Sequence, residues 1–326
     1  MAYAIQCDRH GGPEVMEYRT VELPVPGPGE IRVRIHAAGL NYIDVYHRTG
    51  YYPAAELPTG LGVEAAGVVE EVGPGVSRWS GGERVAWAGG KPGTYGQYHI
   101  VPEDLVVRIP DSMEFEAAAA MMLKGMTARY LLRQTYPLRA GEAILIHAAA
   151  GGVGSILTQW AHHLGATVIG TVGSPEKAEQ ARSAGCTHTI LYREESVVER
   201  VNDITGGAGV SVAYDAVGKD TLLESLQCLC QRGLLVSYGQ SSGPLDSFDP
   251  VLLSRHGSLY LTRPSLFHYI GSREELEENV AELFHVVSDG VVKIPVRNRF
   301  PLQEAAAAHR ALENRETSGS TVLVVD

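Results

Sequence analysis

The sequence predicts a mixed α/β protein in which a doubly wound parallel sheet is joined to a second, β-rich domain. The first third of the chain consists of short apolar runs separated by glycine and proline, and the middle alternates strand patterns with helix patterns. The length of 326 residues is about twice that of a typical domain. Hydrophobic residues make up 44% and charged residues 20%, which is the balance of a globular protein.

The β-rich prediction depends on period-two alternation near the N-terminus. Residues 30–39 alternate, with Ile31 and Val33 on the same face of the expected strand. Further strands are expected at residues 63–73 and 83–89, because turn-forming glycine, proline and serine residues separate these runs. Strands at such short spacing indicate a compact and strongly curved β domain.

The middle of the chain follows a regular strand–helix order after a helix expected at residues 112–136. Strands alternating with helices of 10–15 residues imply right-handed βαβ units and a parallel sheet. Six such strands match a doubly wound dinucleotide-binding fold. The strands are expected at residues 143–148, 167–173, 188–192, 210–217, 233–239 and 258–266, and the helices between them at residues 153–165, 174–185, 194–206 and 219–231.

The C-terminal segment breaks this alternation from about Ser272. Amphipathic helices are expected at residues 273–290 and 301–319, and a strand at residues 320–326. Because no further strand–helix repeat is evident, we expect this tail to return to the first domain. The expected domains are residues 1–123 with 270–326 for the β-rich part, and 124–269 for the parallel sheet.

Charge and composition narrow the class of partner. Lys and Arg total 27 against 38 Asp and Glu, and the net charge of -11 argues against nucleic acid and anionic membranes as partners. No apolar run approaches the roughly 18 residues of a membrane span, and no secretory signal is visible, so a cytoplasmic protein is expected. The four cysteines are too scattered for a disulfide framework. Cys228 and Cys230 are expected on one helix, where residues two apart do not share a face.

A glycine-rich turn follows the first strand of the alternating region. The dinucleotide fingerprint has glycine at its first, third and sixth positions, which here hold Ala149, Gly151 and Gly154. Gly151 and Gly152 let the backbone approach a pyrophosphate, and Gly154 permits close packing of helix on strand. The helix N-terminus adds free N–H groups. Taken alone, the turn fits a packing role equally well, but its place at the first strand favours a bound dinucleotide.

The end of the second strand indicates which dinucleotide is bound. An NAD site usually carries an acid there, whereas this strand ends at Gly173 and Ser174. A carboxylate at about 4 Å would oppose a 2′-phosphate by roughly 4 kcal/mol at an effective dielectric of 20. The missing acid, with Lys177 and Tyr192 nearby, favours NADP(H). One alternative is that Lys177 is an ordinary exposed lysine. Glu176 would also oppose the phosphate if it did not face solvent.

Several motifs together resemble a known family. They are "GPGEIRVRIHAAGLNYIDVYHRTGYYP", "LPTGLGVEAAGVVEEVG", "GERVAW", "LKGMTARYLL" and "HAAAGGVG". They resemble the medium-chain dehydrogenase/reductase superfamily and, more closely, its zinc-independent quinone oxidoreductase branch, which includes zeta-crystallin. The resemblance covers essentially the whole chain. It implies a GroES-like catalytic domain built from both chain ends and a Rossmann domain between them.

The resemblance also bears on metal binding. In zinc-dependent relatives a Cys stands where this chain has Asn41, and a His where it has Val63. A catalytic zinc needs three protein ligands, which Asn and Val cannot replace. The four-Cys structural lobe is missing as well. His36, His47 and His99 remain as alternative ligands, although no local spacing supports them, so we expect no metal.

Site residues are assigned from this resemblance and from the chemistry that a quinone acceptor needs. Catalytic roles are expected for Asn41, Tyr46, Tyr52 and Arg263. The alternatives are that these tyrosines only pack and that Asp44 only caps a helix. Cofactor contacts are expected for Asn41, Asp44, Lys124, Thr127, Gly151, Gly152, Val153, Gly154, Gly173, Ser174, Lys177, Tyr192, Val217, Gly239, Ser241 and Arg315.

The expected function is reduction of a quinone by direct hydride transfer from NADPH, without metal or flavin. A quinone accepts hydride readily and its hydroxyl products are comparatively acidic, so the protein needs mainly to bind and orient the reactants. Two alternatives stay open: reduction of activated C=C bonds in enals or enones, and NADPH binding without turnover. The resemblance also implies a homodimer through an edge strand within residues 257–266.

Overall fold

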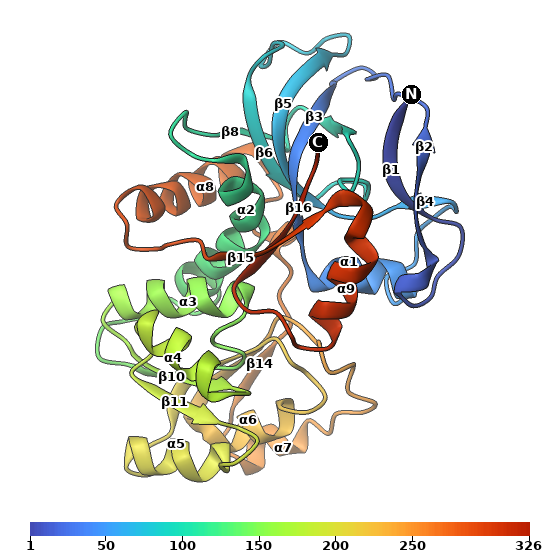
Figure 1. Cartoon of the computed structure of the whole chain (residues 1–326). Coiled ribbons are helices and arrows are strands. Elements are labelled where there is room, and N and C mark those ends of the chain that lie inside the picture. The colour runs from blue at the N-terminus through green and yellow to red at the C-terminus, as the bar shows by residue number, and fades with distance from the viewer. The chain divides into compact units, whose positions relative to one another are not determined.

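The computed structural model describes all residues from 1 to 326 and divides into two compact units (Figure 1). The β-rich unit comprises Met1–Lys124, Gly271–Val280 and Ile294–Asp326. The parallel-sheet unit comprises Gly125–Ile270 and Ala281–Lys293. The tail expected to return to the first domain is therefore shared, because its residues 281–293 group with the parallel sheet.

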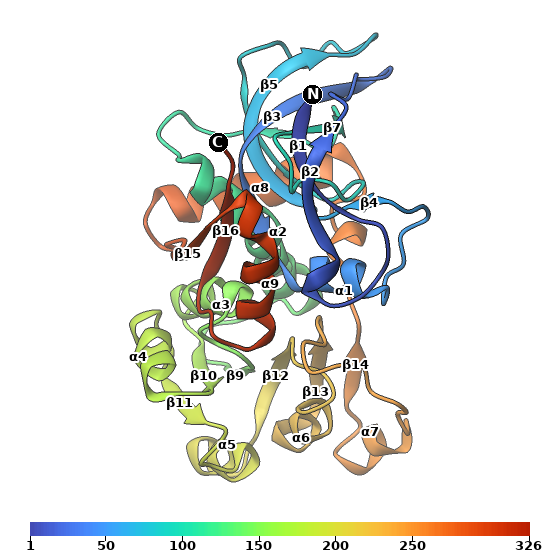
Figure 2. The ribbon, with the colours of Figure 1, turned by 45° about the vertical axis from the view of Figure 1, so that its right-hand side comes forward.

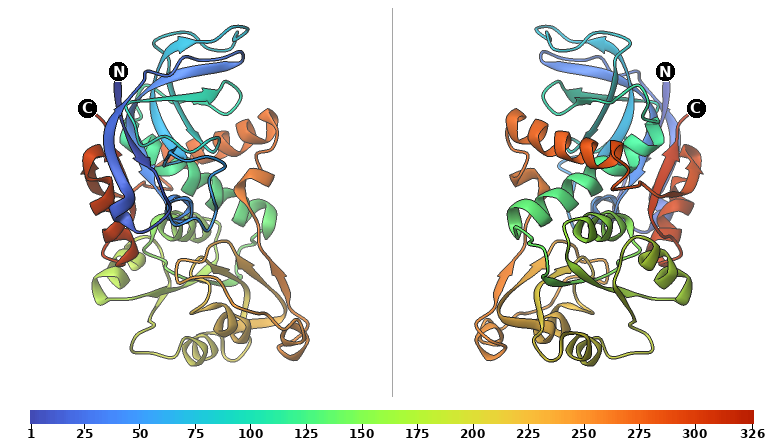
Figure 3. Two further views of the ribbon diagram at one scale, coloured as in Figure 1. Left: turned by 90° about the vertical axis from the view of Figure 1, so that its right-hand side faces the viewer. Right: turned by 90° about the vertical axis from the view of Figure 1, so that its left-hand side faces the viewer.

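The β-rich unit contains a seven-stranded sheet that joins the two ends of the chain. The C-terminal strand β16 pairs antiparallel with β3. Both ends of the chain, marked N and C, lie on this unit in the two views of Figure 3. β3 also pairs with β5 and β7, so it lies at the centre of the sheet. The strands are β15 (Val296–Pro301), β16 (Ser320–Val324), β3 (Glu30–Leu40), β5 (Glu64–Val72), β6 (Arg84–Ala88) and β8 (Val107–Arg108), in this order, with β7 (Tyr98–Pro102) on β3.

A smaller sheet and two helices also lie wholly within this unit. The small sheet has the order β2 (Met16–Val21), β1 (Ala2–Cys7) and β4 (Thr59–Gly60). Helix α1 (Tyr42–Thr49) follows β3, and α9 (Ala305–Glu313) precedes β16. The core is formed by the apolar faces of the strands, with Trp87 and Ile31 fully buried. These apolar positions alternate along β3 as the sequence pattern predicts.

The parallel-sheet unit confirms the predicted fold class. Its six strands are all parallel, and the first strand in sequence lies third in the sheet (Figure 2). This is the doubly wound order in which ligands bind outside the carboxyl ends of the strands. The order is β11 (His188–Leu191), β10 (Thr167–Val172), β9 (Ala143–Ile146), β12 (Val210–Asp215), β13 (Leu229–Ser237) and β14 (Tyr260–Thr262).

The helices of this unit begin and end close to their predicted positions. Ser174 caps α4, because its Oγ accepts a hydrogen bond from the N–H of Lys177. Pro175 occupies the first turn, where its missing N–H costs nothing. The helices are α3 (Gly152–His163), α4 (Pro175–Ser183), α5 (Val197–Thr205), α6 (Leu222–Cys228) and α7 (Val251–Arg255), while α2 (Phe115–Tyr130) and α8 (Arg273–Ser288) contain residues of both units.

Two predicted helices are wrong in extent. The helix expected over residues 301–319 covers only Ala305–Glu313, as α9. The helix expected over residues 219–231 ends at Cys228, and Cys230 belongs to β13. The two thiols therefore lie on different elements rather than on one helix. Among the helices, none combines the length and apolar character needed to cross a membrane.

Candidate active site

The glycine-rich turn brings the start of α3 very close to the end of β9. Ala148 takes a left-handed φ of 53°, and Gly151 is the N-cap of α3. A Cβ placed on Gly154 would lie 2.2 Å from the carbonyl oxygen of Ala148, far inside van der Waals contact. Only glycine fits at position 154, as the packing role of the fingerprint requires. The turn thus has the shape of a cradle for a pyrophosphate.

The residues assigned to the second strand lie together at its carboxyl end. A Cβ on Gly173 would lie 2.8 Å from the hydroxyl oxygen of Tyr192, so the tyrosine ring lies directly against this glycine. Ser174 and Lys177 are joined by the helix cap at 3.3 Å. Glu176 is exposed to solvent. The strand end therefore presents hydroxyl groups and a lysine, without a carboxylate at its tip.

The carboxyl ends of β12 and β13 lie side by side. The buried Asp215 accepts hydrogen bonds from the N–H groups of Val217 at 2.8 Å and Gly218 at 3.0 Å. The N–H of Ser241 donates to the carbonyl of Ala216 at 3.1 Å. These bonds fix the loop of Val217 beside that of Ser241, and Gly239 in the same loop contacts Ala216 so closely that its Cβ would lie 2.7 Å from the carbonyl oxygen.

A buried polar group behind this edge was not foreseen. His147 Nδ1 lies 3.0 Å from Thr171 Oγ1, and its Nε2 lies 2.9 Å from Ser225 Oγ. Burial lowers the pKa of His147, which favours the neutral imidazole. The sequence did carry a signal for this buried polar group: three apolar strands each end in a polar residue, namely His147, Thr171 and Asp215.

The remaining two assignments in this unit lie on other elements. Arg263 directly follows β14, is exposed, and donates from Nη1 to the carbonyl oxygen of Ser237 at 3.2 Å. Thr127 is buried on α2. Of the two, Arg263 is the one tied to the carboxyl end of a strand.

In the β-rich unit, Asn41 and Asp44 form the start of α1. The N–H of Asn41 donates to Asp44 Oδ2 at 2.8 Å, and the Asn41 amide donates from Nδ2 to Glu64 Oε2 at 2.7 Å. Asp44 is completely buried, and its burial raises the pKa of its carboxyl to about 7. Asp44 is the N3 residue of a capping box whose N-cap is Asn41, and the same contact fixes the backbone of Asn41.

Glu64 and Lys124 form a buried ion pair next to Asn41. Lys124 Nζ lies 3.0 Å from Glu64 Oε2, and the N–H of Leu123 donates to Glu64 Oε1 at 2.7 Å. Glu64 is 0% and Lys124 4% exposed. Glu64 was missed, although a charged residue inside the apolar run "GVEAAG" was a visible signal.

Tyr46 and Tyr52 belong to a cluster of four tyrosines. Their ring centroids are 5.4 Å apart in an edge-to-face arrangement. Tyr42 and Tyr51, which were not predicted, lie 6.2 Å and 5.7 Å from Tyr46. Tyr52 also lines a cavity of about 780 Å³ within this unit. The charge of Arg315 opposes the rise that burial gives to the pKa of Tyr42.

Two stretches of the chain match models of known dehydrogenase families. The family model described as an alcohol dehydrogenase GroES-like domain matches residues 27–111, and that described as a zinc-binding dehydrogenase matches residues 152–285. A quinone oxidoreductase of Pseudomonas aeruginosa is 52% identical over 99% of this chain and 100% of its own. A 2-haloacrylate reductase of a Burkholderia species is 47% identical over 99% of each chain.

A solved structure extends the match to three dimensions. The quinone oxidoreductase of Escherichia coli, solved in complex with NADPH, superposes with a TM-score of 0.97 at 48% identity. The superposition covers 99% of this chain and 100% of that one. The chain belongs to the zeta-crystallin-like quinone oxidoreductases of the medium-chain dehydrogenase/reductase superfamily.

The residues present do not fit the catalytic zinc implied by the description of one matching family model. The two positions where zinc-dependent relatives have Cys and His hold Asn41 and the buried Val63. The neighbouring carboxylate of Glu64 is already paired with the ammonium of Lys124. No group of three or more metal-ligating side chains comes together anywhere in the chain. We therefore derive no chemistry from a metal ion.

Proposed function

We propose that this protein is an NADPH-dependent quinone reductase. The observation that carries the proposal is the match to the NADPH-bound E. coli quinone oxidoreductase across the whole chain at 48% identity. The parallel-sheet unit supports it independently, because Gly154 admits no side chain and the end of β10 carries no acid. The first feature suits a pyrophosphate, and the second suits a 2′-phosphate.

The residues assigned to the cofactor would contact it in three places. The turn of Gly151, Gly152, Val153 and Gly154 would hold the pyrophosphate. Gly173, Ser174, Lys177 and Tyr192 would hold the adenosine side, with Arg315 as a further cation for the 2′-phosphate. The loops of Val217, Gly239 and Ser241 would hold the nicotinamide side, together with Thr127, Asn41, Asp44 and Lys124.

The acceptor requires binding and orientation rather than a Lewis acid. Bound NADPH would supply a hydride, and a quinone that takes it up also takes up a proton to become a hydroquinone. Tyr46 and Tyr52 would stack on the flat acceptor or donate to its oxygen, and Arg263 would stabilise the negative charge that develops there. Asn41 would polarise a carbonyl or hold the cofactor amide.

A screen of two cofactors against three acceptors tests the proposal. We expect NADPH oxidation with 1,4-benzoquinone and 9,10-phenanthrenequinone, less oxidation with a 2-alkenal, and no loss of activity with a chelator. NADPH binding without turnover of any acceptor would contradict the proposal and would support the non-catalytic alternative. Loss of activity with the chelator would contradict the metal-free mechanism.

Lys177→Ala should change cofactor preference. Removing one charge-assisted hydrogen bond to the 2′-phosphate should raise the Kd for NADPH about tenfold or more, while the Kd for NADH changes little. Fluorescence titration at two salt concentrations measures both constants, and the exposed Lys293→Ala is the matched control. Equal losses for the two cofactors would reject the phosphate role.

The double variant Tyr46→Phe with Tyr52→Phe should lower quinone turnover. Phenylalanine keeps the ring contacts but removes both hydroxyl donors, so we expect kcat to fall about fivefold or more. The control is Tyr18→Phe on β2, whose ring is partly exposed and stacks on Tyr3. If the steady-state kinetics of the double variant are unchanged, the two tyrosines have only a packing role.

Reduction of an activated C=C bond is the second candidate. The 2-haloacrylate reductase that is 47% identical to this chain supports this candidate, since haloacrylate contains such a bond. A conjugated carbonyl needs the same polarising groups as a quinone. The 2-alkenal arm of the screen separates the two, because this candidate requires the alkenal to be the better acceptor.

We also propose a homodimer formed through β14. This strand is at the edge of the six-stranded sheet, and Tyr260 on it is 59% exposed. An unpaired edge can add a strand from a second copy. Sedimentation at micromolar concentration should give twice the 35.0 kDa of one chain, and a monomer there would contradict the proposal.

A further inference from the structure

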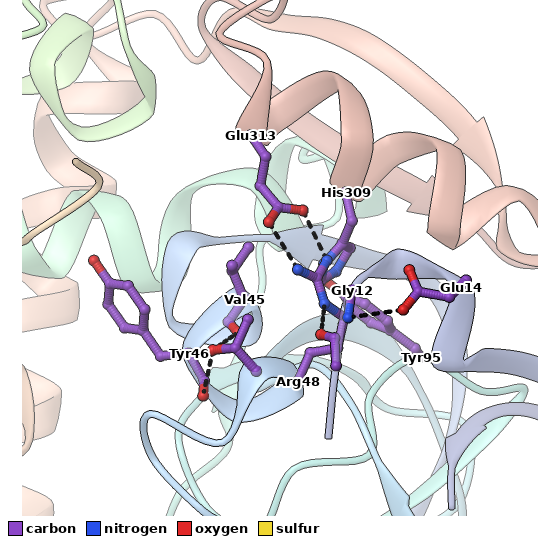
Figure 4. A network of polar contacts seen from close by, with 10 residues as sticks. Gly12, Glu14, Val45, Tyr46, Arg48, Tyr95, His309 and Glu313 are labelled. Carbon is purple, nitrogen blue, oxygen red and sulfur yellow. Dashed lines mark hydrogen bonds and ion pairs between the residues drawn. The ribbon is translucent and has the colours of Figure 1, made fainter. Parts of the chain in front are cut away.

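A chain of polar contacts in the β-rich unit leaves α1 at Arg48, passes through His309 of α9 and through Tyr95, and returns to α1 at Asp44. Figure 4 shows its part from Arg48 to Tyr95. Arg48 is 1% exposed. Its Nη1 and Nη2 donate to the carboxylate of Glu313 at 2.8 and 2.7 Å, and its Nε donates to the carbonyl of Gly11 at 3.1 Å. Nη1 also lies 2.9 Å from His309 Nδ1. The guanidinium is thus bonded through all three of its nitrogens.

The direction of each hydrogen bond in this chain follows from Arg48. A guanidinium only donates, so His309 Nδ1 must accept and the imidazole proton must lie on Nε2. Burial and the charge of Arg48 lower the pKa of His309 to about 3, so the ring is neutral at neutral pH. His309 Nε2 lies 3.3 Å from the hydroxyl of Tyr95, which donates to Asp44 Oδ2 at 2.8 Å. Along the path from Arg48 through His309 and Tyr95, each hydrogen bond is therefore donated in the direction of Asp44.

This polarity excludes conduction of protons along the chain. A proton moving to Asp44 would have to be replaced at His309 from Arg48, and a guanidinium does not release its proton in proteins. These hydrogen bonds can therefore fix the charge and the orientation of the groups that they join, but they cannot deliver protons from solvent to Asp44. What they fix is Asp44 Oδ2, which also accepts the N–H of Asn41.

We propose that Arg48, His309 and Tyr95 are positioning residues that hold Asp44, and through it Asn41, in the orientation needed for reduction of the acceptor. The proposal rests on the proposed function. It gives the C-terminal helix α9 a part in the reaction, although its contact with Asn41 passes only through Tyr95 and Asp44. Glu313 compensates the charge of Arg48 at the outer end of the chain.

The hydrogen bonds from Arg48 to Asp44 should affect the pKa of the Asp44 carboxyl. Burial raises the pKa of Asp44 to about 7, whereas the hydrogen bond from Tyr95 lowers it. The charge of Lys124 also lowers this pKa, and that of Glu64 raises it. Because the charged carboxylate is the better acceptor for Asn41, kcat should fall as the pH is lowered through the pKa of Asp44. Tyr95→Phe removes a hydrogen bond to the charged form, and His309→Met removes the donor that polarises the Tyr95 hydroxyl, so in both variants the midpoint should move to higher pH.

The test compares His309→Met with His309→Gln. Methionine breaks the chain, and we expect the midpoint of the kcat–pH profile to rise by roughly half a unit or more with the KM for the quinone little changed. Glutamine can accept from Arg48 through its oxygen and donate to Tyr95 through its nitrogen, so it should restore most of the wild-type profile. Tyr95→Phe should move the midpoint in the same direction as His309→Met.

The matched control is His36→Phe. His36 is a partly buried neutral histidine of the same unit that stacks on Phe115, outside the Arg48–Asp44 chain of contacts. Its midpoint should stay at the wild-type value. Carboxyl ¹³C NMR of labelled Asp measures the Asp44 titration without turnover, so it still tests the chain if no acceptor is reduced and the proposed function fails. Identical Asp44 titrations in wild type, His309→Met and Tyr95→Phe would overturn the proposal, as would an equal midpoint shift in His36→Phe.

Discussion

Gly154→Ala is expected to weaken NADPH binding about 100-fold and to lower the melting temperature. The added Cβ would lie 2.2 Å from the Ala148 carbonyl oxygen and 3.0 Å from Ala149 Cα. Both neighbours are backbone atoms, so α3 itself must move away from β9. Overpacking of this kind costs about 1–3 kcal/mol. The same displacement moves the N–H groups of the cradle away from the pyrophosphate, and a 100-fold loss corresponds to about 2.7 kcal/mol.

Alanine variants of two further glycines show whether the loss depends on how closely the added Cβ approaches its neighbours. Gly151→Ala places its Cβ 3.0 Å from the same carbonyl oxygen, so a smaller loss is expected. Gly81→Ala, with its nearest neighbour at 3.7 Å, should change neither property. Calorimetric titration with NADPH and thermal unfolding measure the two effects. If Gly154→Ala binds NADPH as tightly as Gly81→Ala does, the turn is not the pyrophosphate cradle.

The parallel-sheet unit was predictable because its signals are local. Each strand of that unit is a short apolar run followed by a helix with its own start and stop residues. Ser174 caps α4 and Gly185 takes a left-handed φ of 95° just after it, as the sequence pattern indicated. Such signals depend on neighbouring residues and need no knowledge of the rest of the fold.

The elements that were missed are those whose stability comes from distant partners. β15 carries the polar residues Arg297, Asn298 and Arg299, and it forms by pairing with β16 rather than by its own pattern. Cys230 lies in β13 because Leu229 already pairs with Val210, so the sheet ends the helix before its apolar pattern does. Pairing across the sheet overrides local preference in both places.

The site divides in the same way. The glycine turn could be read from six consecutive residues, but the contacts that support Asn41 could not. Lys124 meets Glu64 across 60 positions of sequence, and Arg48 meets His309 across 261. A single sequence carries no signal for such pairs beyond an isolated charged residue in an apolar stretch.

The buried pair of Glu64 and Lys124 gives the largest expected effect on stability. Lys124→Met should lower the free energy of unfolding of the β-rich unit by about 3–5 kcal/mol, because it leaves the carboxylate of Glu64 buried without a counter-charge. The Asn41 amide and the Leu123 N–H would remain as its donors, and two neutral hydrogen bonds do not replace an ammonium at 3.0 Å. Chemical denaturation measures the loss.

The double variant Glu64→Gln with Lys124→Met separates an unpaired charge from lost packing. It removes both charges, while the amide oxygen introduced by Glu64→Gln still accepts the N–H of Leu123, so most of the lost stability should return. Arg19→Met, which breaks the exposed pair with Asp8, should cost less than about 1 kcal/mol and shows what a surface pair contributes. If Lys124→Met costs no more than Arg19→Met, Glu64 does not depend on the lysine to compensate its charge, and the hydrogen bonds from the Asn41 amide and the Leu123 N–H are sufficient.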